Sequence, residues 1–128
     1  MGAANENELF ERGIARFNAG EFFEAHEAWE EIWLRAPAEE KAFLQGIIQV
    51  AAAFHHYMRG NLGGAKSLLA AGLAKIKEYP HGHWGINLGK LRDEGQAWLD
   101  ALGAGQEAGS EKLPKIRRLE RNADSRAG

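Results

Sequence analysis

Residues 15–33 read ARFNAGEFFEAHEAWEEIW, and this stretch decides the fold. On both sides of Gly20, apolar residues recur at the three- and four-residue spacing of a helix that buries one face. Glycine often follows the last turn of a helix, because it adopts a left-handed conformation without strain. We therefore predict a helical hairpin whose turn lies at Gly20.

The rest of the chain repeats this pattern of helices separated by breaks. Its three prolines, Pro37, Pro80 and Pro114, each stand where a helical pattern stops, because helix interiors exclude proline. No segment shows sustained alternation of apolar and polar residues, so we expect no strand. The predicted helices span residues 7–18, 21–35, 38–59, 62–78 and 88–102, the last capped by Asn87. The sequence thus predicts an all-α fold, a compact bundle of about five helices built from antiparallel hairpins.

The composition changes after the last predicted helix. Residues 103–112 read GAGQEAGSEK, which is typical of a flexible linker. We predict a helical bundle domain over residues 1–103, and a flexible linker and tail over residues 104–128. Within that tail, Leu113, Ile116 and Leu119 are expected to dock on the bundle as one short turn.

The overall composition excludes several classes of protein. The chain has 128 residues, a net charge of −2 and no cysteine, so disulfides and thiolate metal sites are ruled out and a cytoplasmic location is expected. The first residues lack the features of a signal peptide, and the uncharged stretch 42–58 is shorter than a typical membrane span. We expect no membrane association and no nucleic-acid partner. A short basic run in the tail is interpreted as solvated; it comprises Lys112, Lys115, Arg117, Arg118 and Arg121.

The second predicted helix carries polar residues on its apolar side. With successive residues 100° apart, His26 and Glu30 fall inside a broad apolar arc, and Glu27 falls at its edge. A buried carboxylate must be paired or protonated. Because His26 and Glu30 are four residues apart, they are expected to face each other along the helix.

The third predicted helix carries a stripe that is polar but uncharged, formed by Gln45, Gln49 and His56 together with Ala52. A solvent-facing stripe would normally carry lysine or glutamate, so we infer that the second helix covers it. His55 falls elsewhere on this helix and is interpreted as a separate packed histidine. The two helices would then form a buried polar seam, which comprises His26, Glu27, Glu30, Gln45, Gln49 and His56.

Three roles for the polar seam are open. Its residues can hydrogen-bond one another and fix the helix register. They can hold a divalent metal, with His26, Glu30 and His56 as ligands. They can also perform acid–base catalysis, because burial shifts pKa values toward neutrality. The catalytic residues would then be His26, Glu27, Glu30 and His56, with Gln45 and Gln49 orienting a substrate.

These roles imply two different functions. As an enzyme, the protein would be a metal-assisted or acid–base hydrolase. As a non-enzymatic interaction or dimerisation module, it would use the first hairpin, which is similar to a tetratricopeptide hairpin, to present a groove or a dimer surface. Trp29 and Trp33 either line a ligand pocket or belong to the core. The pair His81 and His83 lies in a predicted loop, where we expect it to be exposed to solvent.

Three stretches together resemble a known family. They are FNAGEFFEAHEAWEEIW, then FLQGIIQVAAAFHHYMRGN followed by GGAKSLL, and finally LPKIRRL. The chain resembles, from Leu9 to Leu119, the domain-of-unknown-function family numbered 309. The resemblance implies a compact bundle of about five helices and no established activity. The family's characteristic positions match the six residues of the polar seam and Gly60.

Overall fold

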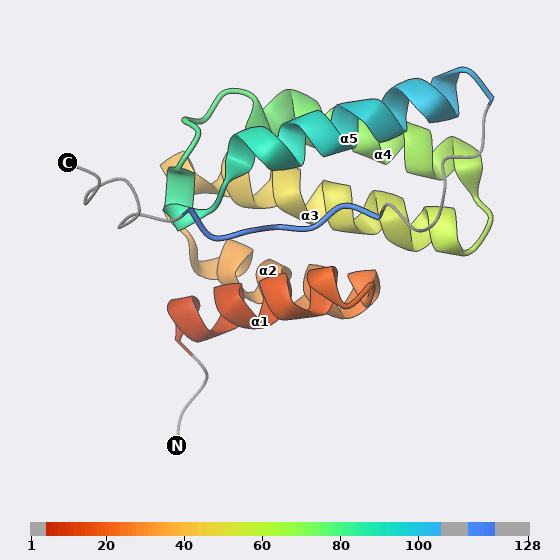
Figure 1. Cartoon of the computed structure of the whole chain (residues 1–128). Helices are drawn as coiled ribbons and strands as arrows, with labels where there is room; N and C mark the ends of the chain where they lie inside the picture. Colours follow the sequence, from red (N-terminus) through yellow and green to blue (C-terminus); the bar gives the residue numbers. More distant parts are fainter. Residues whose placement is uncertain (1–4, 106–112, 120–128) are drawn as a thin grey trace.

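The computed structural model describes residues 5–105 and 113–119, and this part of the chain contains five α-helices (Figure 1). All five lie within two residues of the predicted ends, which confirms the all-α prediction. In the described residues, the one pairing of β type is an isolated bridge between Ile86 and Arg118. The helices are α1 (Glu6–Asn18), α2 (Phe22–Arg35), α3 (Ala38–Met58), α4 (Leu62–Ile76) and α5 (Leu88–Gly103), and a short 3-10 turn, η1 (His83–Gly85), precedes α5.

Local capping interactions and glycine conformations fix the helix ends close to the predicted residues. The Asn5 side chain accepts a hydrogen bond from the Glu8 backbone at 2.8 Å, and the Glu8 carboxylate accepts one from the Asn5 backbone, which together form a capping box. The predicted cap of α5 is confirmed, because Asn87 Oδ1 accepts from the Lys90 backbone at 3.0 Å. Gly20, at φ +80°, occupies the left-handed conformation that ends α1.

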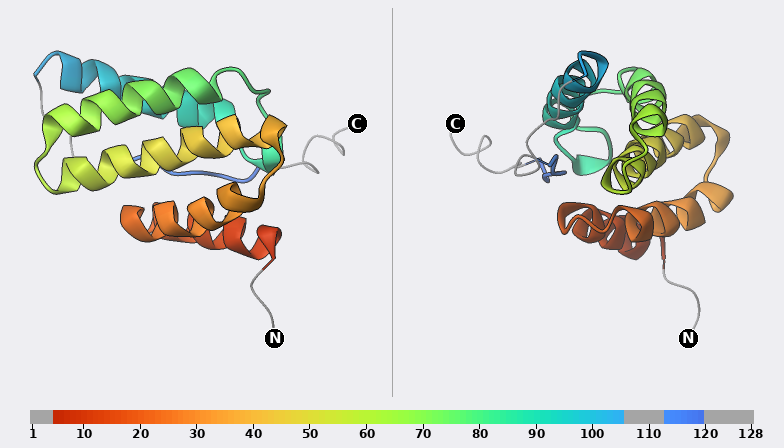
Figure 2. Two further views of the ribbon diagram at one scale, coloured as in Figure 1. Left: turned by 180° about the vertical axis from the view of Figure 1, so that it is seen from behind. Right: turned by 90° about the vertical axis from the view of Figure 1, so that its right-hand side faces the viewer.

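Helices that are neighbours in sequence pack on one another, and α3 makes its most extensive contact with α4. The α1–α2 hairpin lies across one side of the group formed by α3, α4 and α5 (Figure 2). The α3 and α4 backbones approach closely where two glycines meet. A Cβ atom on Gly72 would lie 2.7 Å from the carbonyl oxygen of Gly46, so any side chain here would push the helices apart.

Trp29 is the largest fully buried side chain. Its indole Nε1 donates a hydrogen bond to the Phe10 carbonyl at 3.3 Å, so the polar atom of the ring is satisfied inside the core. The ring also packs on Phe17, with centroids 5.9 Å apart. Gly13 faces the indole from α1, and a Cβ at that position would overlap the ring. The two helices of the first hairpin are therefore joined through Trp29.

Residues 113–119 pack on the helices, but they form an extended segment rather than the predicted short turn. Ile116 is 2% exposed, whereas Leu119 is 37% exposed, so the two do not dock together. In an extended chain, side chains an odd number of positions apart point to opposite sides. Ile116 and Leu119 are three positions apart, which explains the difference in their exposure. Residues 106–112 and 120–128 of the predicted linker and tail lie outside the described residues, and the division at residue 103 stays a prediction.

In the described part of the chain, no helix combines the length and the apolar character needed to cross a bilayer.

Candidate functional site

The His26–Glu30 pair forms on the outer side of α2. His26 Nε2 lies 3.9 Å from Glu30 Oε2, so the two side chains face each other along the helix as predicted. However, the side chain of Glu30 is 52% exposed, against 25% for His26. The prediction that Glu30 is buried is therefore wrong, and water surrounds much of this carboxylate. Glu27, which was predicted at the edge of the apolar arc, is exposed.

The apolar arc of α2 is narrower than the sequence indicates. Phe23 and Leu34 set one edge of the predicted arc, but these side chains are 46% and 67% exposed. The buried part of the helix is centred on Phe22, Trp29 and Ile32, all at most 2% exposed. Glu30 lies between the buried and the exposed apolar residues on the helix surface, so it reaches solvent.

The stripe on α3 meets α2 at one end only. His26, Ala52 and His56 line a small hollow of about 160 Å³, together with Phe23 and His55. His26 and His56 thus lie on one hollow, but contact between the two polar stripes stays a prediction. At the other end, Gln45 is exposed, and the prediction that α2 covers it is wrong. His55, predicted to pack separately, belongs to the same hollow.

The polar atoms of the seam are not joined by hydrogen bonds. His26 Nδ1 and Gln49 Oε1 are buried, and neither has a hydrogen-bond partner in the described structure. His56 Nδ1 lies 3.0 Å from Asn61 Nδ2, so its partner belongs to the cap of α4 rather than to α2. Individual polar atoms are buried, but among the described residues no polar or charged residue is buried as a whole. The polar seam is therefore a partly exposed contact between helices and not a satisfied internal network.

The fold changes the ionisation of His55. Partial burial lowers the pKa of His55 below its usual value. The positive charges of Arg59, His56 and His26 lower the same pKa further, against a smaller opposing effect of Glu24. The folded chain thus favours the neutral form of His55.

This shift predicts a loss of stability in acid. As the pH falls through the ordinary histidine pKa of about 6.5, the unfolded chain takes up a proton at His55 more readily than the folded chain does, so the free energy of unfolding falls. The variant His55→Gln is expected to reduce this fall. Urea unfolding of both proteins at about pH 7.5 and about pH 5.5 measures the difference. An identical pH dependence in the two proteins would contradict the prediction.

Phe23 stands between two hollows on the outer surface. One is the histidine hollow, and the other, of about 440 Å³, lies beside Gly20, Glu24 and Met58. The Phe23 ring stacks on His26, with centroids 5.8 Å apart, and contacts His55 at 5.3 Å. Met58 is itself 56% exposed. We call this surface the α2–α3 face; it comprises Phe23, His26, Glu27, Glu30 and Leu34 from α2, and Ala52, His55, His56 and Met58 from α3.

Among the described residues, the polar seam forms no ready-made metal-binding site. Among residues 5–105 and 113–119, no three histidine, aspartate or glutamate side chains lie close enough together to hold a metal ion. The metal, catalytic and substrate-binding roles assigned to the seam stay predictions.

The two tryptophans of α2 have different surroundings. Trp29 is fully buried in the core. Trp33 is half-buried, and Lys41 Nζ lies 4.1 Å from the centroid of its ring. Trp33 is therefore the one of the two whose ring reaches the surface.

The histidines of the loop before α5 differ from the prediction. His81 is exposed, but His83 packs on Phe43, with ring centroids 4.6 Å apart. His83 Nε2 lies 3.0 Å from Glu40 Oε1, and Trp84 Nε1 donates to the same oxygen at 2.9 Å. The predicted exposure of His83 is wrong because one carboxylate on α3 holds both rings against the core. Trp84 adopts a left-handed conformation, φ +58°, to reach this position.

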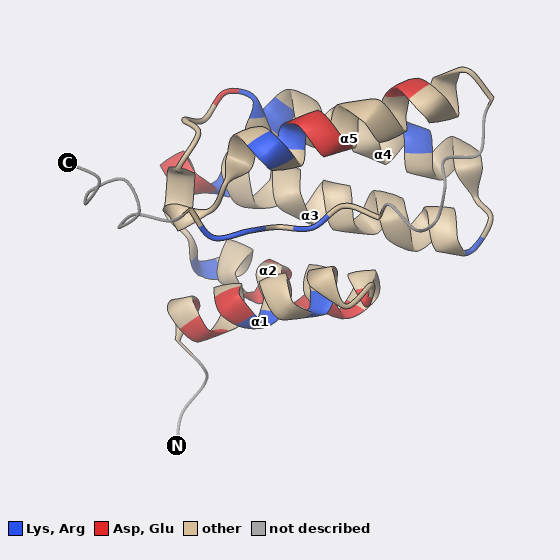
Figure 3. Ribbon diagram, in the orientation of Figure 1, with Lys and Arg blue, Asp and Glu red and all other residues tan. Residues whose placement is uncertain are grey.

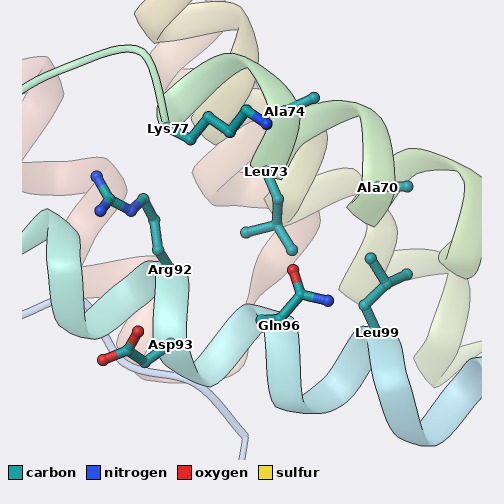
Figure 4. A pocket seen from close by; sticks show the side chains of 8 residues that line it. All are labelled: Ala70, Leu73, Ala74, Lys77, Arg92, Asp93, Gln96 and Leu99. Carbon is teal, nitrogen blue, oxygen red and sulfur yellow. The ribbon is translucent and has the colours of Figure 1, made fainter.

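A third hollow, of about 390 Å³, opens between α4 and α5 (Figure 4). Its floor is apolar and includes Leu73 and Leu99, and the Gln96 amide points into the space between the helices. Lys77 and Arg92 stand at one end, with Asp93 beside them. The carboxylate of Asp93 offsets part of their charge, and no residue of the polar seam reaches this hollow.

Comparison with known proteins connects the chain to a family without an assigned activity. The family model described as "Domain of unknown function (DUF309)" matches residues 10–68. This match confirms the family resemblance over that stretch, which runs from α1 into α4 and contains the whole α2–α3 face.

Two relatives extend the comparison. An uncharacterised protein of Aquifex aeolicus (strain VF5) is 32% identical over 111 residues, which are 86% of this chain and 32% of that protein. The uncharacterised protein YpuF of Bacillus subtilis (strain 168) is 43% identical over 51 residues, which are 39% of this chain and 29% of that protein. The matched regions thus span about a third of the length of these curated relatives, and neither supplies an activity.

Proposed function

We propose that the domain is a helical interaction module, and that its α2–α3 face binds a basic, amphipathic helical segment of another protein. The observation that carries this proposal is the exposure of Phe23 and Leu34, at 46% and 67%. These two residues are eleven positions apart and share one side of α2. Large apolar side chains grouped on a surface commonly mark a binding site.

Charge complementarity supports a basic partner. Glu24, Glu27, Glu30 and Glu31 are all exposed on α2, where the one arginine, Arg35, stands at the end of the helix. A second copy of the chain docked through the same face would bring these carboxylates together, which is unfavourable. The acidic face also argues against nucleic acid as the partner.

The hollows on both sides of Phe23 suit a helix. A helical ligand presents apolar anchors every three or four residues, and each anchor needs a recess. The hollows of about 160 and 440 Å³, both lined by Phe23, provide such recesses. The match of parts of this chain to about a third of two longer proteins fits a module that works within larger chains. Its cytoplasmic location stays a prediction.

A synthetic helix of leucine and lysine, with leucines on one side, tests the proposal. The full chain is expected to bind this peptide, and Phe23→Ser is expected to weaken binding about tenfold or more, because a central aromatic anchor commonly dominates an interface. Leu119→Ser removes a comparably exposed apolar side chain from outside the face and should leave the affinity unchanged. Fluorescence anisotropy with a labelled peptide measures all three proteins.

Two control peptides separate the contributions. Replacing the leucines with alanine keeps the charge and should abolish binding, and replacing the lysines with glutamate should abolish it as well. Equal affinity of the wild type and Phe23→Ser, or equal binding of the alanine peptide, would overturn the proposal.

The His26–Glu30 pair carries a second candidate function, acid–base or metal-assisted hydrolysis, because His26 lines a hollow and its Nε2 lies 3.9 Å from Glu30 Oε2. A rise in the melting temperature with a divalent cation that disappears in His26→Gln would favour the metal-assisted form. Unchanged melting with every cation would sink it.

A further inference from the structure

Residues 113–119 hydrogen-bond to α1, α5 and the loop before α5, and Figure 1 shows the segment running along these elements. We call the surface of these elements that holds the segment the groove. One edge of this segment pairs with the loop in the manner of a β-strand. The Leu119 backbone donates to the Gly85 carbonyl at 2.9 Å, and the Asn87 backbone donates to the Arg117 carbonyl at 2.7 Å. The groove thus recognises an extended backbone.

Asn18, the last residue of α1, holds the opposite edge of the segment. Its Oδ1 accepts from the Ile116 backbone at 2.7 Å, and its Nδ2 donates to the Ile116 carbonyl at 2.8 Å. A primary amide carries one acceptor and two donors, so it can replace the edge of a neighbouring strand. This clamp binds the main chain and does not depend on the side chain at position 116.

The side chains of the segment add selectivity. Ile116 is 2% exposed and forms part of the core, so the groove takes an apolar side chain at its centre. Glu94 accepts from the Lys115 backbone at 3.1 Å and from Arg117 Nη1 at 3.2 Å. Arg118 pairs with Glu11 of α1. Basic residues therefore lie along the segment, and acidic residues lie on α1 and α5 beside it (Figure 3).

We propose that this groove is a peptide-binding site, and that its partner in trans is the 113–119 segment of a second copy of the chain. The side chains that hold the segment, from Asn18, Glu94 and Glu11, belong to α1 and α5, and the loop before α5 contributes backbone hydrogen bonds. An identical segment from another copy makes the same contacts, which is the condition for exchange of an element between protomers. This site is separate from the α2–α3 face.

The exchange is measured with the full chain. Because the chain has no cysteine, Ala104→Cys provides a single labelling position at the exposed end of α5. Mixing donor- and acceptor-labelled samples is expected to give energy transfer that grows with concentration. Ile116→Asp should remove it, because a charge does not fit the buried position. Absence of transfer up to about 1 mM, or transfer that persists in Ile116→Asp, would overturn the proposal.

A labelled peptide with the sequence of residues 113–119, LPKIRRL, tests the groove directly. It is expected to bind Ile116→Asp about tenfold more tightly than the wild type, in which the tethered segment competes at high effective concentration. Adding Asn18→Leu should reduce this binding about tenfold, and the peptide LPKDRRL should not bind. Ile116→Ala replaces Ile116→Asp if the latter does not fold. A peptide that ignores the Asn18 substitution, or fails to bind the folded variant, contradicts the assignment.

Discussion

Replacing Trp29 with alanine is expected to lower the free energy of unfolding by about 3–5 kcal/mol, the usual cost of removing a buried tryptophan. The ring is fully buried and packs on Phe10 and Phe17 of α1. Its loss also leaves the Phe10 carbonyl without its indole donor. Because the hairpin of α1 and α2 is joined through this ring, the surrounding helices cannot readily close the cavity. Urea unfolding followed by circular dichroism measures the change.

Trp33→Ala is the matched control for this prediction. Trp33 lies on the same helix one turn later, but it is half-buried and its ring is covered on one side by the Lys41 side chain. Removing it is expected to cost about 1–2 kcal/mol, because less apolar area returns to water. An equal decrease in the free energy of unfolding of the two variants would contradict the claim that the buried Trp29 ring joins α1 and α2.

Gly72→Ala is expected to lower the free energy of unfolding by about 2–3 kcal/mol, although alanine has a higher helix propensity than glycine. A Cβ at this position would lie 2.7 Å from the Gly46 carbonyl and 2.9 Å from Val50 Cγ2. The first of these atoms belongs to the α3 backbone and cannot move away alone. The α3 and α4 helices must therefore separate along their most extensive contact.

Gly63→Ala makes the same substitution in the same helix where space is free. In the described part of the chain, apart from the adjacent residues and backbone of α4 itself, no atom lies within 4 Å of the position that a Gly63 Cβ would take. The change is expected to raise the free energy of unfolding by up to about 1 kcal/mol, because alanine loses less backbone entropy on folding. Opposite signs for the two glycine variants in thermal or urea unfolding would support the close approach of α3 and α4, and a shared sign would exclude it.

The helices were predictable because their limits are local. Proline at 37, glycine at 20 and 60, and asparagine at 87 each act through their own backbone geometry or a cap within three residues. No distant contact is needed to place such a boundary. Sequence periodicity therefore located all five described helices.

The exposure of the polar seam was less predictable, because it depends on which apolar residues the fold leaves uncovered. A helical wheel treats Phe23 and Leu34 as buried on account of their chemistry, and Glu30 then falls among buried residues. The helices that pack on α2, which are α1 and α3, bury only the side that contains Trp29 and Ile32. How far one helix extends over another is a property of the packing and not of either sequence segment.

The conformations of the loop before α5 and of the 113–119 segment depend on long-range contacts, although the apolar residues of the segment predict that it docks. Glu40 holds His83 and Trp84 across more than forty positions, and Asn18 holds Ile116 across 98. A short basic run at the end of a domain is usually a solvated tail. The isoleucine at its centre was the signal, but its binding groove exists only after the helices have packed.

The Asn18–Ile116 contact also determines the order in which the chain can fold. The helices pack on their neighbours in sequence, so these contacts close short loops and can form early. The contact between Asn18 and Ile116 closes a loop of nearly the whole chain, and its entropic cost delays it. The helices can therefore pack on one another before residues 113–119 dock, and the contact between α1 and α5 through this segment forms last.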